Sequence, residues 1–379
     1  MKRKVFSLLL CGILGFSLVA CNNEKELTLY RHTKIDCGFN TICSLNAYTE
    51  TEEEFNMLFN TMTEDFAYYH KIFDIYNNYE GINNIKTVND NAGIKPVEVD
   101  QALIDLILLS KDINELSNGA FDITNGSLLK VWHNYRDAGL IKNMNGELGD
   151  IPELEELELA NKHKGFDKVI IDDEKNTVYI TDKDVSLDVG GVAKGFTVEI
   201  IADHLVELGL KHGAVNGGGN QKIIGTKGDG TGWNIGIQDP RAETTAGVVS
   251  EGSIAMFPNQ TDVAVVTSGD YQNFYFGEGK RLLAHIIDPD TLYPADHFYG
   301  VSVLVEDSGL ADCLSTALFV LDYNEGLEFI NKVNEAYNLD LQVLWVSGEA
   351  LDETSIQAKT NTTQYITVTS NASKEVVTK

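Results

Sequence analysis

The sequence predicts a single α+β domain in which helices pack against a sheet. Two amphipathic helices are expected over residues 51–75 and 100–117, because apolar residues recur there at helical spacing. Runs typical of strands follow at residues 248–254, 263–268 and 300–305, and glycine turns separate many of the elements. The 379 residues, of which 43% are hydrophobic, suffice for one large domain or two small ones.

The N-terminus has the layout of a bacterial lipoprotein signal. A basic start is followed by an apolar run over residues 5–19 and a small-residue cleavage site that ends in Cys21. The run is shorter than the roughly 20 residues that span a bilayer, so a transmembrane helix is the weaker alternative. We expect residues 1–20 to be a signal peptide, Cys21 to carry the lipid and residues 21–26 to form a tether. The mature protein would then lie outside the cytoplasm, held to the cell membrane by its acyl chains.

Boundary signals support the other elements. Thr51 and Glu54 match a capping box at the start of the first helix. Asn118 and Gly119 are a usual pair at the end of the second helix. Residues 166–181 have the pattern of a β-hairpin.

The charge of the chain is strongly negative. Its net charge is −28 at pH 7. A phosphate backbone needs a basic surface, so this composition argues against nucleic acid as a partner. An anionic ligand would need local help from a metal ion, a lysine or a helix N-terminus.

Three cysteines lie beyond the lipid-bearing position. If Cys37 and Cys43 sat on one extended strand they would be about 20 Å apart, too far to bridge, and only a turn at Gly38 would let them pair. We therefore expect free or buried thiols at these positions and at Cys313. No Cys-x-x-Cys pair or Cys/His cluster indicates zinc.

Residues 186–196 are the stretch around which the chain is expected to be organised. An apolar run enters Gly190-Gly191 and leaves into an amphipathic segment, with Asp188 and Lys194 beside the turn. Glycines allow a close backbone approach to a ligand, and the first amides of a helix favour an anion. Close packing of a strand-turn-helix junction would also require Gly-Gly.

Phe121 and Asp122 follow the second helix directly. They could form an aromatic shelf with a carboxylate beside it, or a core phenylalanine with a capping aspartate. Asp312 and Thr316 are four residues apart on a predicted helix, so both project from one face. A carboxylate beside a hydroxyl suits a hard cation such as Mg²⁺. A threonine bonded back to its own helix is the alternative.

Five short motifs occur in order along the chain. They are Asp188-x-Gly-Gly-x-Ala-Lys-Gly195, Gly217-Gly218-Gly219-Asn220, Thr267-Ser268-Gly269-Asp270-Tyr271, His285-Ile-Ile-Asp-Pro289 and Asp312-x-x-Ser-Thr316. Ala120-Phe121-Asp122-Ile-Thr124 and Phe73-x-x-Tyr76 accompany them. Together they resemble the ApbE family of FAD:protein FMN transferases. The resemblance implies a mostly antiparallel sheet with packed helices, T-fold-like, over residues 27–350. Beyond the resemblance, a composition rich in Ser, Thr and Asn indicates a polar tail over residues 351–379.

The resemblance also implies an activity and a site. The FMN half of FAD would move to a Thr or Ser hydroxyl of an acceptor redox protein, with Mg²⁺ bound and AMP released. The metal would be held by Asp312, Thr316 and the backbone carbonyl of Gly191, with Ser315 as a weaker contributor. His285 and Asp288 would lie beside the pyrophosphate, with His285 as the acid/base candidate or as a structural histidine. The residues expected to contact FAD are Phe39, Tyr76 (or Tyr79 in its place), Ala120, Phe121, Asp122, Asp188, Lys194 and Ile287.

Two other functions remain open at this point. The same chemistry with water as the acceptor would make the protein an FAD pyrophosphatase. A non-catalytic lipoprotein could instead bind and deliver FAD. The chain contains no Asp-x-x-Thr-x-x-Thr segment of the type that acceptors carry, so we expect it to modify another protein.

Overall fold

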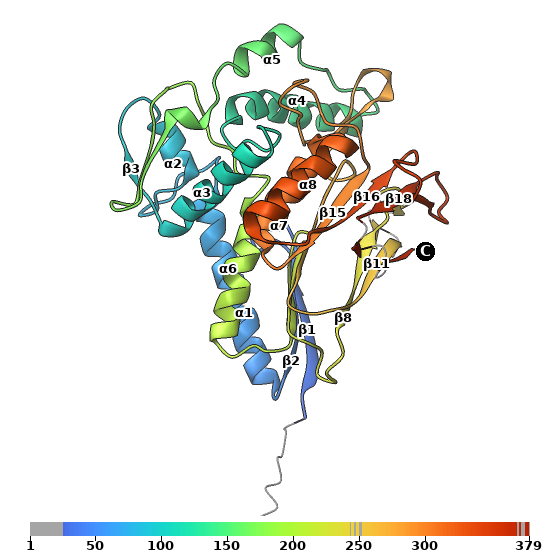
Figure 1. Cartoon of the computed structure of the whole chain (residues 1–379). Coiled ribbons are helices and arrows are strands. Elements are labelled where there is room, and N and C mark those ends of the chain that lie inside the picture. The colour runs from blue at the N-terminus through green and yellow to red at the C-terminus, as the bar shows by residue number, and fades with distance from the viewer. Residues whose placement is uncertain are drawn as a thin grey trace, which may run out of the picture.

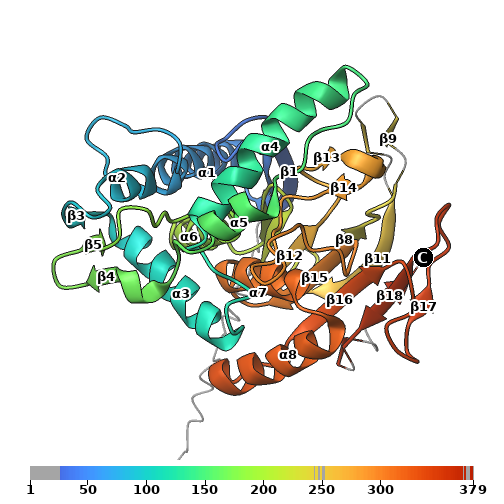
Figure 2. The same cartoon turned by 90° about the horizontal axis from the view of Figure 1, so that it is seen from above.

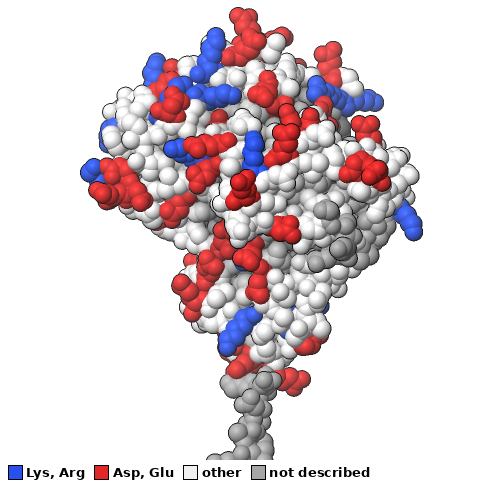
Figure 3. All heavy atoms as spheres, in the orientation of Figure 1, with Lys and Arg blue, Asp and Glu red and all other residues white. Residues whose placement is uncertain are grey.

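The computed structural model describes residues 26–242, 244–245, 248–249, 252–369, 371–372 and 376–378. The predicted signal peptide and Cys21 lie outside these residues. Within the described part, no helix combines the length and apolar character needed to cross a bilayer. Asp and Glu side chains are spread over the face in Figure 3, with Lys and Arg between them.

A nine-stranded sheet runs through the molecule, and every pair of neighbouring strands is antiparallel (Figure 1). This confirms the predicted mostly antiparallel α+β fold. In spatial order the strands are β1 (Thr28–Lys34), β2 (Cys43–Thr49), β6 (Gly213–Gly217), β7 (Asn220–Ile224), β12 (Ala264–Gly269), β15 (Gly300–Val305), β16 (Gln342–Ser347), β18 (Tyr365–Val368) and β17 (Ile356–Gln357).

Each face of the central strands is covered by a different layer. Val266 and Val303 pack into the core beneath the helices, whereas the adjacent Val265 and Leu304 face a second, smaller sheet. Successive side chains of a strand point to opposite faces, so both layers are apolar at their contact with the sheet. Helices α7 (Ser308–Val320) and α8 (Tyr323–Tyr337) contribute to this core, and α1 (Glu52–Phe73) and α6 (Ala193–Glu207) form a neighbouring core with β2 and β6. The smaller sheet contains β8 (Trp233–Gln238), β11 (Ser253–Gln260) and β19 (Val377–Thr378).

Further helices and short strands form a lobe above the main sheet, seen from above in Figure 2. Its helices are α2 (Ile85–Asp90), α3 (Gln101–Leu116), α4 (Gly126–Met144) and α5 (Leu154–Ala160). The expected hairpin is present as β4 (Val169–Asp172) and β5 (Thr177–Ile180), and β3 (Val97–Glu98) joins it. Two pairs of two-residue strands complete the described structure: β9 (Thr244–Thr245) with β10 (Val248–Val249), and β13 (Tyr275–Phe276) with β14 (Leu282–Leu283).

The predicted helix boundaries are confirmed to within two residues. The Thr51 side chain accepts a hydrogen bond from the Glu54 amide at the start of α1. Asn118 and Gly119 follow α3 with φ of 52° and 90°, the left-handed conformation that ends many helices. The apolar run before Gly190 is not a strand, because its only bridge joins Ser186 to Asn125.

The chain after residue 350 is not a separate tail, so that prediction is wrong. β18 pairs with β16 inside the main sheet, and β17 pairs with β18. Ile366 is buried, and the buried Gln364 side chain donates a 2.8 Å hydrogen bond to Asp239. The polar composition of this segment did not indicate β18, because the strand that pairs with it, β16, lies elsewhere in the sequence.

Cys37 and Cys43 form a disulfide, so the expectation of free thiols is wrong for this pair. Their Cα atoms are 6.2 Å apart, within the range that a disulfide spans. The loop turns at Gly38 with φ of 113°, and the Cys37 amide donates to the Thr41 carbonyl. The disulfide and this hydrogen bond together close the loop between Cys37 and Cys43. Cys313 is free and buried, as expected.

The helices α6 and α7 approach each other closely at Gly195. A Cβ atom at this position would lie 2.3 Å from the Ser308 carbonyl oxygen and 2.5 Å from Asp312 Cβ. Backbone and a short side chain are rigid neighbours, so any larger residue would push the helices apart. Glycine is therefore required for packing at this position. The packing interpretation of the sequence concerned Gly190-Gly191, where a Cβ atom on Gly191 would lie 3.3 Å from Phe121 and 3.4 Å from Thr316.

We predict that Gly195→Ala lowers the free energy of unfolding by about 1–3 kcal/mol, the usual cost of overpacking a tight core. Gly300→Ala is the matched control, since its Cβ would meet only ordinary contacts at 3.6 Å or more. Urea denaturation of both variants measures the difference. Equal stability of the two variants would refute the close-approach argument.

Candidate active site

A cavity of about 320 Å³ lies where the upper lobe meets the main sheet. Its volume is within the range of about 300–1,000 Å³ that is usual for small-molecule sites. The structure brings eleven of the predicted site residues to its wall: Phe39, Ala120, Phe121, Asp122, Asp188, Gly191, Lys194, His285, Ile287, Asp312 and Thr316. They come from five separate segments of the chain, so the cavity exists only in the folded protein.

The Asp312 carboxylate is buried, and the described residues donate hydrogen bonds to one of its two oxygen atoms. Its Oδ2 atom accepts hydrogen bonds from the Gly195 amide at 2.8 Å and from Asn220 Nδ2 at 2.9 Å. Burial raises its pKa, while the Lys194 charge and these two donors act in the opposite direction. Among the described residues, none donates a hydrogen bond to Oδ1. The Gly195 amide at the start of α6 thus holds Asp312 rather than a ligand.

Two further oxygen atoms lie beside this carboxylate on the cavity wall. Thr316 Oγ1 is 3.4 Å from the Gly191 carbonyl oxygen and 3.4 Å from Ser268 Oγ. A carboxylate, a hydroxyl and a carbonyl form an all-oxygen donor set, which suits a hard cation. Ser315 does not line the cavity, because its hydroxyl bonds to the Asp312 carbonyl and to Ser268.

Asp188 is held by its own turn and faces a histidine. Its Oδ1 accepts from the Gly190 amide at 2.9 Å, and its Oδ2 lies 3.8 Å from His133 Nε2. His133 also lines the cavity, and its Nδ1 is 3.3 Å from the Tyr76 hydroxyl. Burial lowers the pKa of His133, and Asp188 opposes that shift. Sequence reasoning missed His133, since a single histidine after Trp132 carries no local signal.

Tyr76 and Tyr79 occupy different surroundings. Tyr76 is largely exposed and reaches the cavity only through His133. The Tyr79 hydroxyl donates to Asp74 at 2.7 Å, inside its own loop. The structure therefore puts Tyr76, and not Tyr79, against a residue of the cavity wall.

Phe39 and Phe121 are the phenylalanines that line the cavity. The Phe39 amide donates to His70 Nδ1 at 3.1 Å, in the loop that the disulfide closes. The Phe121 amide donates to Ser117 Oγ, and its carbonyl accepts from Asn114. Asp122 accepts two hydrogen bonds from Thr124, and burial raises its pKa. Phe121 is both a core residue and a cavity residue, so the two sequence interpretations are compatible.

His285 and Asp288 are separated by the fold. His285 lines the cavity, and its Nδ1 is buried without a hydrogen-bond partner among the described residues. Burial, aided by the positive charge of Lys194, lowers its pKa to about 3, so the ring is neutral at pH 7. Asp288 lies in a separate hollow with Arg281 and Tyr293, where its Oδ1 accepts from the Asp290 amide.

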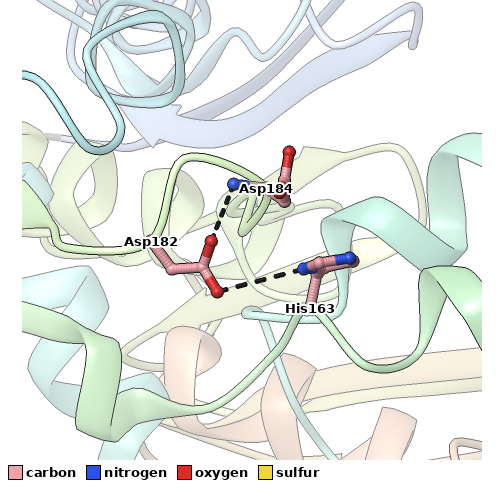
Figure 4. A group of neighbouring side chains, drawn as sticks. All are labelled: His163, Asp182 and Asp184. Atoms are coloured by element: carbon pink, nitrogen blue, oxygen red, sulfur yellow. Dashed lines mark hydrogen bonds and ion pairs between the residues drawn. The ribbon is translucent and has the colours of Figure 1, made fainter.

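One other cluster combines a histidine with two carboxylates. His163, Asp182 and Asp184 lie together outside the cavity (Figure 4). Asp182 is 3.9 Å from His163 Nδ1 and 3.8 Å from the Lys168 ammonium, and it accepts from the Asp184 amide. A lysine at this distance already neutralises the carboxylate, so the cluster is explained by its own ion pairs.

We predict that His285 destabilises the protein in acid. Its pKa is about 3 when folded against an ordinary value of 6.5, so the unfolded chain binds the extra proton between these values. The contribution of His285 to the free energy of unfolding has its full value above pH 6.5 and falls as the pH drops through that window, by up to about 1.4 kcal/mol per pH unit. His285→Gln should therefore lose less stability than wild type between pH 7 and pH 5 in urea denaturation. The exposed His297→Gln should follow wild type, and parallel profiles for all three proteins would contradict the prediction.

Comparison with known proteins places this chain in one family. The model of the ApbE family matches residues 39–339. An FAD:protein FMN transferase of Haemophilus influenzae is 28% identical over 353 residues, which cover 89% of this chain and 93% of that protein. One of Treponema pallidum is 27% identical, with 86% of each chain covered. The crystal structure of the ApbE protein from Thermotoga maritima, 28% identical, superposes with a TM-score of 0.68 over 84% of this chain and 94% of that one. The family model covers well over half of the chain, which therefore belongs to the ApbE family.

Proposed function

We propose that this protein transfers the FMN half of FAD to a Thr or Ser hydroxyl of another protein. The acceptor oxygen would bond to the FMN phosphorus while the bond from that phosphorus to the bridging oxygen breaks. AMP would leave with the bridging oxygen, and the hydroxyl proton would pass to a base or to solvent. The observation that carries the proposal is the oxygen cluster of Asp312, Thr316 and Gly191 on the wall of a ligand-sized cavity. The similarity to FAD:protein FMN transferases supports the same activity.

Magnesium is the cation that we propose for this cluster. Asp312 Oδ1, Thr316 Oγ1 and the Gly191 carbonyl would hold it, and it would neutralise charge on the pyrophosphate. A chain with a net charge of −28 needs such local compensation to bind an anion. Lys194 adds positive charge on the same wall. A non-catalytic carrier would have little use for a cation site at this place.

The flavin and adenine parts of FAD would contact the remaining wall residues. Phe39 and Phe121 offer aromatic surface, and Asp122 and Asp188 offer carboxylate acceptors. His285 Nδ1 has no hydrogen-bond partner among the described residues and would accept a hydrogen bond from a substrate, whereas its pKa of about 3 makes the neutral ring a weak base at pH 7. Asp288 does not face the cavity, so we assign no contact with FAD to it.

We also propose that the protein is anchored outside the cytoplasm by lipid on Cys21. The support is the sequence of residues 1–21, with its basic start, apolar run and small-residue site before the cysteine. Acceptors would then be surface or membrane redox proteins on the same side of the membrane.

The test uses the chain from residue 22 onward, mixed with FAD and Mg²⁺, with and without a soluble acceptor domain that carries one Asp-x-x-Thr-x-x-Thr segment. We expect AMP only when the acceptor is present, in equal amount to flavin found on its threonine by mass spectrometry. AMP without acceptor would favour a pyrophosphatase. Tight FAD binding with no AMP in either case would favour a carrier and refute the proposal.

Asp312→Ala should abolish AMP release while FAD still binds, because it removes the proposed metal ligand and leaves the aromatic wall intact. A loss of about 10²–10³-fold in rate is the usual effect of removing one group that stabilises developing charge. Ile170→Ala, an exposed substitution on β4, is the control for handling and concentration. Turnover like that of wild type in the Asp312 variant would refute the metal assignment.

A further inference from the structure

A second hollow adjoins the cavity beside β2, β6 and the turn that follows β6. Its volume is about 690 Å³, and it is open to solvent along the surface. It shares four wall residues with the cavity: Asn40, Thr41, Gly218 and Gln272. We call this hollow the β2–β6 groove; its other lining residues are Ile35, Asp36, Ile42, Ser44, Asn216 and Gly219.

Strand alternation explains why this part of the sheet is uncovered. Cys43 and Leu45 of β2 point into the core beneath α1 and α6. Ser44 points the other way and lies opposite Asn216 on β6, so two polar side chains form the floor. No described residue lies within 4 Å of where a Gly219 Cβ would be. The groove is thus formed by a polar sheet surface and by a glycine turn that no described side chain covers at Gly219.

The groove meets the cavity at the end where the metal ligands lie. Gly218 is part of the turn between β6 and β7, and Asn220, two residues on, donates to Asp312. Ser268 also belongs to this end, because its hydroxyl lies 3.4 Å from Thr316 Oγ1. A group that enters from the groove past Gly218 would therefore arrive near Asp312.

The lining of the groove suits an extended peptide. Amide and hydroxyl side chains can pair with a peptide backbone, and Ile35 and Ile42 are 81% and 52% exposed apolar contacts at its rim. Asp36 is the only charged residue in the lining, on a chain with a net charge of −28. In the described structure, β1 is the edge strand of the sheet beside this groove, with backbone groups free to pair with another strand.

We infer that the β2–β6 groove binds an extended segment of the acceptor protein and delivers its hydroxyl to the Asp312 end of the cavity. The inference rests on the proposed transferase function and adds to it the surface that recognises the partner. FAD would occupy the cavity through its other walls, so the two substrates would meet at the four shared residues. The groove would set the KM for the acceptor and leave the affinity for FAD unchanged.

The experiment compares Ile42→Asp and Asn216→Trp with wild type. The first places a charge at the rim, and the second fills the floor with an aromatic residue that strands tolerate well. Ile170→Asp is the matched control, because Ile170 is 53% exposed on β4, outside the groove. The acceptor probe is the soluble domain with one Asp-x-x-Thr-x-x-Thr segment, and FAD affinity is followed by flavin fluorescence.

We expect the KM for the acceptor domain to rise at least about tenfold in both groove variants, with kcat and the Kd for FAD within about twofold of wild type. The control should match wild type in all three. An unchanged acceptor KM in both groove variants, or a changed FAD Kd at equal acceptor KM, overturns the inference while the transferase function stands. Failure of wild type to transfer flavin overturns the proposed function, and the inference with it.

Discussion

The pair of hydrogen bonds to Asp312 Oδ2 is the interaction on which the site depends. One comes from the first turn of α6 through the Gly195 amide, and the other from the β6–β7 turn through Asn220. Each donor is more than 90 residues from Asp312 in sequence, and both meet it at a single oxygen atom. Because both donors act on Oδ2, the other carboxylate oxygen stays available at the cavity wall.

The close approach of α6 to α7 brings the Gly195 amide within hydrogen-bonding distance of Asp312. Glu199 of α6 is largely buried, accepts from the Ser308 amide at 2.6 Å and pairs with Lys222 of β7 at 2.6 Å. Burial raises the pKa of Glu199, and these partners oppose the shift. The same two helices are in contact at Gly195, where no side chain would fit. The packing at Gly195 and the polar contacts of Glu199 thus fix the distance between α6 and α7. This distance sets the position of Asp312 relative to the Gly195 amide.

Local signals predicted local structure well. The Thr51 cap and the spacing of Asp312 and Thr316 depend on neighbours within four residues, and the structure has both as expected. Features that depend on distant partners were missed or wrong. The Cys37–Cys43 bond required a loop conformation that spacing alone could not decide. His133 belongs to the cavity only because α4 crosses beside Asp188.

The most direct measurement is the anomalous diffraction of a crystal grown with FAD and Mn²⁺, which takes the same oxygen ligands as Mg²⁺. We expect one strong peak in the cavity, in contact with Asp312 Oδ1, Thr316 Oγ1 and the Gly191 carbonyl. The absence of a peak at these oxygen atoms, in a crystal in which FAD is bound, would contradict the central claim. A peak at His163, Asp182 and Asp184 instead would move the metal to the cluster that the ion pairs now explain.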